Sequence, residues 1–267
     1  MKAQYEACFE RNIGLFSLEE QEKIRNSRIA VAGLGGIGGL AAERLLRLGL
    51  GGLRLTDPGT FEASNINRQY GSTTKNLGQN KAEIVYEQIK DINPSADIEY
   101  STEGLTRKSD IPSFLADCQV VIDAMDFGMF RESVLLQRAA RQMGVYYLFT
   151  AAIGFGAISV VFSPGGITLE DYDRIPADID LDTASQISIP FDRILPVVPK
   201  YVQDKKLITD IIAGRIPVPT SSIGAGLAAI QAASEVMNII VGRDTPVAPN
   251  YTYLDLVDRR IIVGTVN

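Results

Sequence analysis

Residues 28–57 read RIAVAGLGGIGGLAAERLLRLGLGGLRLTD, and this stretch decides the fold. A short apolar run with β-branched residues over 28–33 predicts a buried strand, and residues 53–57 predict a second one. Between them lie a glycine-rich turn, Gly33–Gly39, and a helical pattern that ends near Gly49. A strand, turn, helix and strand within about thirty residues indicate two parallel strands joined by a right-handed crossover.

The turn also predicts a nucleotide site. Its small residues bring backbone amides close to a phosphate, and the N-terminus of the helix adds a positive dipole. Asp57 ends the second strand about twenty residues further on, where an acid binds ribose hydroxyls. A purely structural turn is the alternative, and the turn does not identify the nucleotide. The residues expected to form this cradle are Gly33, Gly35, Gly36, Ile37 and Gly38.

Strands and helices continue to alternate along the chain. We expect helices over 17–26, 79–92, 128–143 and 222–241, and strands over 98–101, 118–125, 145–152, 157–164, 251–256 and 260–266. This order predicts an α/β fold with a doubly wound, mostly parallel, Rossmann-like sheet and a C-terminal antiparallel extension.

We predict one domain over 1–267, and the segment rich in Pro and Asp is expected to be a lid or linker with one short helix near 203–213. The predicted parts are an N-terminal helical arm (1–27), a nucleotide-binding core (28–164), a long crossover loop (165–220) and a C-terminal helix with strands (221–267).

Composition excludes several kinds of chemistry. The 267 residues include no His and two Cys. Without His, the chain lacks the commonest general base and every Ser–His or Cys–His nucleophile pair. Two Cys supply neither a four-thiolate zinc site nor a disulfide framework, so we expect no zinc and a reducing cytoplasmic setting. Carboxylates, Arg, Lys, backbone amides and bound cofactors must carry the chemistry.

The net charge and the hydropathy pattern argue against a nucleic-acid partner and against a membrane span. The net charge of −6 and the pI of about 4.9 argue against a broad nucleic-acid surface. The first twelve residues contain acids and no apolar core of a signal peptide. Polar residues interrupt the apolar stretch 223–241 on one helical face, so it predicts a core helix and no membrane span.

Two motifs after Asp57 indicate an enzyme that acts on a triphosphate. The chain reads SNINRQ over 64–69 and GQNKAE over 78–83. Arg68 and Lys81 would supply the cations that phosphates require, with Asn65 and Asn67 as hydrogen-bond donors. A dehydrogenase has no need of this cluster. The alternative is a solvated polar loop.

The end of a later strand carries a third signal. IDAMD over 122–126 places Asp123 and Asp126 at the carboxyl end of a central strand, where ligands bind in open α/β sheets. A carboxylate there suits Mg²⁺ bound to triphosphate oxygens. An ordinary strand-ending Asp is the alternative.

With these motifs the sequence resembles the ubiquitin-activating-enzyme-like adenylyltransferases, the ThiF/MoeB/HesA group, over most of its length. The resemblance also covers Arg11 and the late segment PVPTSSIGAGLAAIQAASEV. It implies binding of ATP and Mg²⁺ and adenylation of a carboxylate with release of pyrophosphate. It further implies a homodimer, because the arginine that matches Arg11 reaches the neighbouring subunit's site.

The resemblance assigns roles to individual residues. Asp57 would hold the ribose, and Asp126 would be the metal ligand. Phosphates would meet Asn65, Asn67, Arg68, Gln69 and Lys81, and the catalytic set would be Arg11, Arg68, Lys81 and Asp126. A substrate carboxylate is already ionised at pH 7, so this chemistry needs positioning and charge neutralisation and no general base.

The chain departs from the family pattern at three places. It lacks the two CxxC pairs that bind zinc in many members, and residues 165–220 lack the cysteine that forms a thioester. Cys118, in a buried strand, is expected to be a packing residue. Phe127 follows Asp126 where relatives often have Asn. We therefore expect a separate acceptor protein to take the activated acyl group.

The resemblance leaves two classes of substrate open. One is the C-terminal Gly of a ubiquitin-like or sulfur-carrier protein. The other is a small acid, such as a modified transfer-RNA nucleoside or the pyridinol precursor of the iron-guanylylpyridinol cofactor. The missing cysteines favour a small acid, and the acidic pI weakens the transfer-RNA variant.

An NAD- or flavin-dependent oxidoreductase and a non-catalytic partner subunit are the alternatives to adenylation. Aromatic residues that form either a substrate wall or core are Phe61, Tyr70, Phe127, Phe130 and Phe155.

Overall fold

The computed structural model describes residues 2–105, 107–177, 179–181, 189–202, 204–212, 215–216 and 218–266. These residues form an eight-stranded sheet of order β3-β2-β1-β4-β5-β6-β7-β8. The first five strands in this order pair in parallel and the last three pairings are antiparallel, which confirms the predicted fold class. The strands are β1 (Arg28–Ala32), β2 (Gly52–Thr56), β3 (Asp97–Ser101), β4 (Val120–Asp123), β5 (Tyr146–Ile153), β6 (Gly156–Phe162), β7 (Asn250–Asp255) and β8 (Arg260–Thr265).

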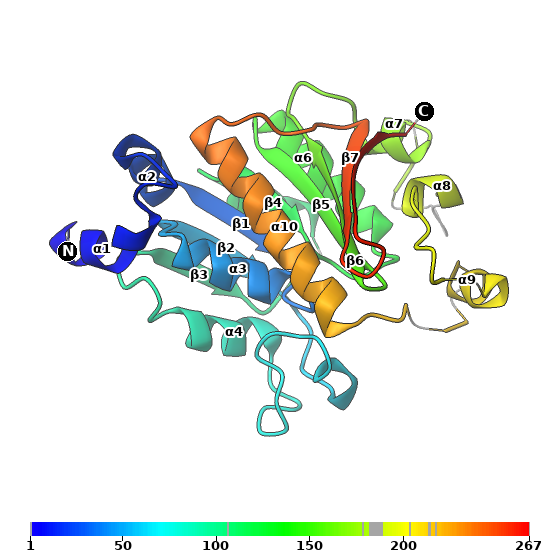
Figure 1. Cartoon of the computed structure of the whole chain (residues 1–267), viewed down its shortest axis with the longest axis horizontal. Coiled ribbons are helices and arrows are strands. Elements are labelled where there is room, and N and C mark those ends of the chain that lie inside the picture. The colour runs from blue at the N-terminus through cyan, green and yellow to red at the C-terminus, as the bar shows by residue number, and fades with distance from the viewer. Residues whose placement is uncertain are drawn as a thin grey trace.

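Helices cover both faces of the sheet (Figure 1). One buried cluster joins α2, α3, α4 and α10 to the sheet, and a second joins α5, α6 and α7 to the other face. The helices are α1 (Lys2–Phe9), α2 (Leu18–Arg25), α3 (Gly38–Arg47), α4 (Lys81–Ile89), α5 (Ile111–Leu115), α6 (Phe130–Gln142), α7 (Leu169–Asp173), α8 (Phe191–Ile194), α9 (Lys205–Ile212) and α10 (Ser222–Val241).

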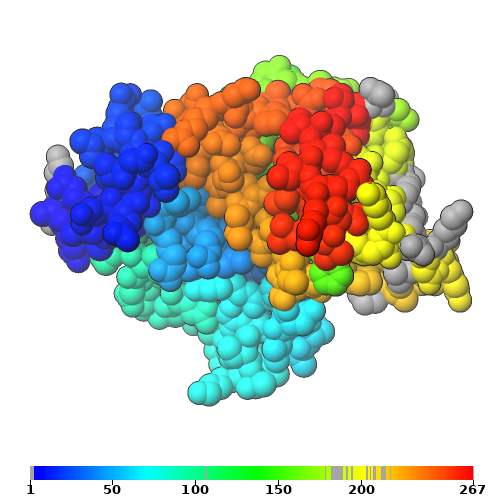
Figure 2. Space-filling view, viewed as in Figure 1, coloured from blue at the N-terminus to red at the C-terminus, as the bar shows by residue number. Residues whose placement is uncertain are grey.

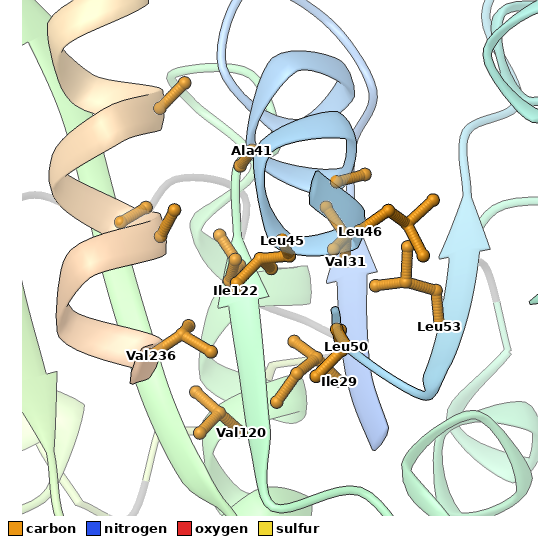
Figure 3. Packing of buried hydrophobic residues seen from close by; sticks show 14 of the residues in the cluster. Ile29, Val31, Ala41, Leu45, Leu46, Leu50, Leu53, Val120, Ile122 and Val236 are labelled. Carbon is orange, nitrogen blue, oxygen red and sulfur yellow. The ribbon is translucent and has the colours of Figure 1, made fainter. Parts of the chain in front are cut away.

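The core explains why β1 reads as a continuous apolar run. Ile29 and Val31 point to the α3 side, whereas Ala30 and Ala32 belong to the cluster on the opposite face. Side chains alternate along a strand, so a strand buried on both faces needs apolar residues at every position. Figure 3 shows Leu45 of α3 packed among side chains from β1, β4 and α10.

The N-terminal arm packs at one end of the molecule. Ser17 and Glu20 form the capping box that starts α2. The Gln21 side chain donates to the carbonyl oxygen of Leu48 at 2.9 Å, just beyond the last residue of α3. Arg243, just beyond α10, donates to the Leu15 carbonyl oxygen at 3.0 Å and pairs with Glu20. The arm therefore lies at the C-terminal ends of both α3 and α10.

Helix α10 matches its predicted range. It is long and apolar enough to cross a membrane by composition, but 56% of its most apolar window is buried. It packs on β5, β6 and α3, which fits the predicted core helix.

The crossover segment contains the helix predicted near 203–213, observed as α9. It also contains the short helices α7 and α8, which were not predicted from the sequence. Residues 178, 182–188, 203, 213–214 and 217 of the predicted crossover loop lie outside the described residues.

Candidate active site

The glycine-rich turn packs directly on the loop that follows β4. Gly33 has φ +88°, and a Cβ there would lie 2.4 Å from the carbonyl oxygen of Ala124. A Cβ on Gly38 would lie 1.9 Å from the carbonyl oxygen of Gly33. No other residue fits either position, so these glycines allow the close approach of β1, α3 and β4. The amides at the start of α3 thereby face the carboxyl edge of the sheet.

Two other segments close over this turn. A Cβ on Gly35 would lie 3.5 Å from Gln69 Nε2, and one on Gly36 would lie 3.5 Å from Arg68 Cγ and 3.4 Å from Ala225 Cβ. The loop 64–69 and the N-terminus of α10 therefore flank the glycines. Because Gly35 and Gly36 have no side chains, the turn remains open between the loop 64–69 and the N-terminus of α10.

Asp57 links the end of β2 to the turn. It is 7% exposed, and its carboxylate accepts hydrogen bonds from the amides of Leu34 at 2.6 Å and Gly59 at 2.7 Å. An ionised carboxylate has about four acceptor positions, so lone pairs remain for ribose hydroxyls. Asp57 therefore shapes the turn and still fits the predicted role.

Asn80, which is not among the residues predicted from the sequence, places Lys81 next to Asp57. Its side-chain oxygen caps α4 by accepting from the amides of Ala82 and Glu83, and its nitrogen donates to the carbonyl oxygens of Asp57 and Gly59. A Cβ on Gly59 would lie 3.0 Å from Asp57 Oδ1 and 3.4 Å from Lys81 Nζ. An Asn directly before a helical pattern is the signal that predicts such a cap.

Arg68 is held by its own loop. It donates to the carbonyl oxygen of Ser64 at 3.0 Å and to Asn67 Oδ1 at 2.9 Å, while Asn67 Nδ2 donates to the carbonyl oxygen of Thr220 at 3.0 Å. In the part of the chain that the structure describes, neither Arg68 nor Lys81 has a carboxylate within 4.0 Å. Two cations beside a glycine turn without acid partners are typical of a phosphate site.

The remaining polar residues of this loop are buried. Asn65 Oδ1 accepts from the amide of Glu62 at 3.1 Å and so shapes the loop. Gln69 is 8% exposed, and its Oε1 is buried without a hydrogen-bond partner beside Gly35. An unsatisfied buried acceptor costs about 1–3 kcal/mol, so a donor from a ligand would relieve it.

The aspartate that ends β4, Asp123, and the one that follows the strand, Asp126, have different environments. Asp123 is 2% exposed and accepts from the Tyr147 hydroxyl and from the amide of Met125 at 3.1 Å, and burial raises its pKa. Asp126 is exposed, and among the described residues its carboxylate contacts no donor. Asp123 therefore holds the loop, whereas Asp126 is free to bind a ligand at the predicted position.

A cavity of about 310 Å³ lies along β2 and β3, close in sequence to Asp57. Its lining includes Thr56 from β2 and Ser101 from β3, and the amide of Asp57 donates to the carbonyl oxygen of Ser101 at 3.2 Å. The Thr56 hydroxyl is buried without a hydrogen-bond partner. The cavity therefore offers an unsatisfied polar group next to the predicted ribose position.

Arg11 lies away from the other candidate residues of its own chain. It is exposed in a short 3₁₀ helix, Glu10–Asn12, and Asn12 donates to the carbonyl oxygen of Leu48 beyond the C-terminal end of α3. The glycine-rich turn is at the other end of α3, and ten helical residues span about 15 Å. The structure brings the other candidates together but leaves Arg11 apart.

The aromatic residues divide between core and surface. Phe61 is 1% exposed and belongs to the core. Phe127 and Phe155 are 49% and 38% exposed. The ring of Phe127 lies edge-on to that of Phe130, with ring centroids 5.4 Å apart, and the ring of Phe155 lies edge-on to that of Tyr201, with centroids 5.5 Å apart. A substrate wall is therefore restricted to these exposed rings.

The described residues offer few groups for thiol chemistry or for binding a metal ion. Cys118 is buried, and burial raises its pKa to about 11, which fits a packing thiol. Across the described residues, no three or more Asp, Glu or Cys side chains are grouped to hold a metal ion. A cation at this site would therefore depend on Asp126 together with ligand oxygens.

Known proteins resemble the chain in sequence. The tRNA threonylcarbamoyladenosine dehydratase of Bacillus subtilis is 35% identical over 118 residues, which cover 44% of this chain and 46% of the relative. The sulfur carrier protein ThiS adenylyltransferase of Escherichia coli is 28% identical over 148 residues, covering 55% and 58%. SUMO-activating enzyme subunit 1 of Rattus norvegicus is 31% identical over 115 residues, covering 43% and 32%. The matches thus span about a third to three fifths of these relatives.

Solved structures resemble it in fold. The structure of PaaA superposes with a TM-score of 0.72 at 19% identity, over 98% of this chain and 74% of PaaA. The structure of E. coli MccB with ATP superposes with a TM-score of 0.73 at 16% identity, over 97% of this chain and 70% of MccB. The ThiF family model matches residues 9–266. With nearly its whole length matched, from the N-terminal arm to β8, this chain belongs to the ThiF family.

Proposed function

We propose that this protein is an ATP-dependent adenylyltransferase that activates a carboxylate as an acyl-adenylate. One observation carries the proposal. Arg68 and Lys81 flank an open glycine turn without carboxylate partners, and the free carboxylate of Asp126 lies at the carboxyl edge of the same sheet. A dinucleotide oxidoreductase would not require two cations and a metal-binding acid at the phosphates.

The site fits ATP. The adenine would enter the 310 Å³ cavity beside the unsatisfied Thr56 hydroxyl, and the ribose would bind Asp57. The phosphates would lie on the turn, where the glycines leave room and the amides of α3 point outward. Asn65, Asn67 and Gln69 are the remaining polar groups near the phosphates, where Gln69 would donate through the Nε2 that lies beside Gly35.

Asp126 would hold Mg²⁺ through one carboxylate and the phosphate oxygens, which suits the preference of this cation for few protein ligands. Bound there, the cation would neutralise charge on the triphosphate. Asp123 keeps Asp126 in place, because its carboxylate holds the amide of Met125 in the same loop. The residues present therefore fit both ATP and its metal.

The chemistry then follows from the residues. An oxygen of the substrate carboxylate attacks the α-phosphorus, and the bond from that phosphorus to the bridging oxygen breaks. The electron pair leaves with pyrophosphate. Arg68 and Lys81 offset the negative charge that develops on the phosphates. No proton moves from the nucleophile, so the absence of His is no obstacle.

The proposed substrate is a small-molecule acid, with the C-terminal Gly of a ubiquitin-like or sulfur-carrier protein as the alternative. The lack of cysteine over 165–220 supports a product that remains the adenylate until another protein accepts it. Relatives whose names refer to a transfer-RNA nucleoside and to a sulfur carrier both match this chain. The exposed rings of Phe127 and Phe155 would contact a flat acid.

The test is exchange of radiolabelled pyrophosphate into ATP, with a panel of carboxylic acids and carrier proteins. We expect exchange that depends on one acid and on Mg²⁺. Arg68→Ala should abolish exchange while ATP binding remains measurable by calorimetry. Absence of exchange across the panel, together with NAD binding tighter than ATP binding, would replace this function with the oxidoreductase.

A further inference from the structure

One tyrosine that the proposed chemistry does not use has its hydroxyl buried beside β4. Tyr147 of β5 is 1% exposed, and its ring packs edge-on against that of Phe162, with ring centroids 5.6 Å apart. A phenylalanine ring would fill the same space, so packing does not explain the hydroxyl. A buried hydroxyl needs a hydrogen-bond partner, and that partner indicates what the group does.

The partner is Asp123, the last residue of β4. The Tyr147 hydroxyl donates to Asp123 Oδ2, and the amide of Met125 donates to Asp123 Oδ1 at 3.1 Å. Ser133, in the first turn of α6, also hydrogen-bonds Asp123. These three donors are two hydroxyls and one amide, and all of them are neutral. Removal of one donor would leave part of a buried carboxyl unsatisfied and weaken its hold on the others.

The protonation states of these groups favour the arrangement. Burial raises the pKa of Tyr147 well above its usual value, and the nearby carboxyls of Asp123 and Asp173 raise it further. The hydroxyl therefore keeps the proton that it donates. Burial also raises the pKa of Asp123, whereas the hydrogen bonds from Ser133 and Tyr147 lower it. The tyrosine thus favours the ionised carboxylate, which accepts from all three donors.

The same cluster closes both ends of the loop that presents Asp126. At the first end, Asp123 holds the amide of Met125, which directly precedes Asp126. At the second end, the carbonyl oxygen of Asp126 accepts from the amide of Met129 at 3.1 Å. The carbonyl oxygen of Met129 in turn accepts from the amide of Ser133 at 3.0 Å. The Ser133 side chain returns to Asp123, so the backbone around the exposed Asp126 is anchored in one buried cluster.

We infer that Tyr147 is a positioning residue for the Asp126 loop, residues 124–129: its hydroxyl, acting through Asp123, fixes the backbone that presents Asp126 to a cation bound with ATP. Among the described residues the Asp126 carboxylate contacts no donor, so its position depends on this backbone. Groups behind a metal ligand orient it, and their loss usually costs about 10–100-fold in metal affinity. The role at the cation rests on the proposed function, whereas the effect on the loop does not.

The preceding residue provides a matched control. Tyr146 is also in β5, and successive side chains of a strand point to opposite faces of the sheet. Tyr146 packs against the cluster on the face that carries α10, which is the face seen in Figure 2. Tyr146→Phe therefore removes a hydroxyl from the same strand and leaves Asp123 untouched.

The first test is ATP binding measured by calorimetry, with Mn²⁺ as the probe cation and, separately, with EDTA. We expect Mn²⁺ to tighten ATP binding to the wild type. Tyr147→Phe should weaken binding with Mn²⁺ by about 10–100-fold and change binding in EDTA by less than about twofold. Tyr146→Phe should change neither. A general loss of packing would weaken both kinds of binding, so equal losses in Tyr147→Phe would overturn the inference.

A double-mutant cycle tests the route through Asp123. In an Asp123→Asn background, Tyr147→Phe should cost less than about twofold in binding with Mn²⁺, because groups that act as a unit do not have additive effects. A full second loss would show that the hydroxyl acts by another route and would overturn the inference.

Hydrogen exchange measured by NMR tests the loop without nucleotide. The amide of Met125 should exchange faster in Tyr147→Phe than in the wild type and in Tyr146→Phe, because Asp123 holds it less firmly. An unchanged exchange rate would overturn the positioning role.

The results separate this inference from the proposed function. A wild type that binds ATP equally with Mn²⁺ and with EDTA would count against the metal site of the proposed function, and with it against the role at the cation. A wild type that prefers Mn²⁺, with a Tyr147→Phe variant that keeps this preference, would overturn the inference alone.

Discussion

At the scale of the residue, the site depends on cations whose charge no neighbouring acid neutralises. Lys81 begins α4 beside Asp57, yet no carboxylate lies within 4.0 Å of its ammonium group among the described residues. Lys90, just beyond the other end of α4, is paired with Glu87 at 2.6 Å. The same residue type therefore has a free charge at one end of the helix and a paired charge at the other.

This contrast yields a matched pair of variants. Lys81→Ala should lower the rate of ATP–pyrophosphate exchange by about 10²–10³-fold, the usual cost of losing one group that stabilises charge in a transition state. Lys90→Ala should leave the rate within about twofold, because an exposed ion pair contributes little. Equal losses in the two variants would contradict a phosphate-binding role for Lys81.

At the scale of the element, α3 connects the turn to the core. Leu45 is fully buried among side chains of β1, β4 and α10, and the N-terminus of the same helix borders the phosphate cradle (Figure 3). Packing of α3 therefore holds the amides that would bind phosphate. A short helix obtains most of its stability from such packing.

Leu45→Ala should lower the free energy of unfolding by about 2–5 kcal/mol, through lost burial and the cavity left behind. Leu77→Ala, at a 40% exposed loop position, should change it by no more than about 0.5 kcal/mol. Urea denaturation measures both. A loss below about 1 kcal/mol for Leu45→Ala would contradict the packing described for α3.

Helix α7 in the crossover segment carries a pH-dependent group. Burial raises the pKa of Asp173 from 3.8 to about 7, although Arg193 lowers it in part. The folded state therefore keeps a proton on Asp173 that the unfolded state releases at lower pH. Between about pH 4 and pH 7, this group makes the free energy of unfolding fall as pH rises.

Asp173→Asn should flatten this part of the profile and make the protein relatively more stable at pH 8 than at pH 4, compared with wild type. Urea titrations at pH 4.5, 6 and 8 measure the effect. Asp171→Asn, at an exposed carboxylate on the same helix, is the control. A slope unchanged by Asp173→Asn would show that another group titrates in this range.

At the scale of the whole molecule, the arm and the site lie at opposite ends of α3 and α10. Arg11 belongs to the exposed arm, whereas Asp126 lies at the end of β4 beside the glycine-rich turn. The homodimer expected from the sequence would bring the Arg11 of one subunit to the site of the other. Activity in mixed dimers distinguishes an Arg11 that acts on the partner's site from one that only packs.

Arg11→Ala and Asp126→Ala proteins should each be inactive in exchange. When they are mixed in equal amounts and allowed to exchange subunits, activity should return to about a quarter of the wild-type value, because half of the dimers hold one intact site. Two copies of the same variant, mixed in the same way, are the control. No recovery in dimers with verified subunit exchange would rule out a role for Arg11 across the interface.

The sequence by itself determined the order of the strands and of the longer helices, the glycine-rich turn and most residues of the candidate site. These depend on local rules: a strand buried on both faces must be apolar throughout, a tight turn onto backbone requires glycine, and parallel strands bring their carboxyl ends to one edge. Asp57, Arg68, Lys81 and Asp126 follow such ends and turns, so their neighbourhood was predictable.

Only the tertiary structure decided which polar residues keep a free charge. The two aspartates of IDAMD look alike in sequence, but Tyr147 binds Asp123 from another strand, and Asp126 remains exposed. Likewise the position of Arg11 and the anchoring role of Asn80 depend on contacts between residues far apart in the chain. Spacing along the chain specifies the local backbone, whereas exposure and pairing depend on what the rest of the fold packs against each side chain.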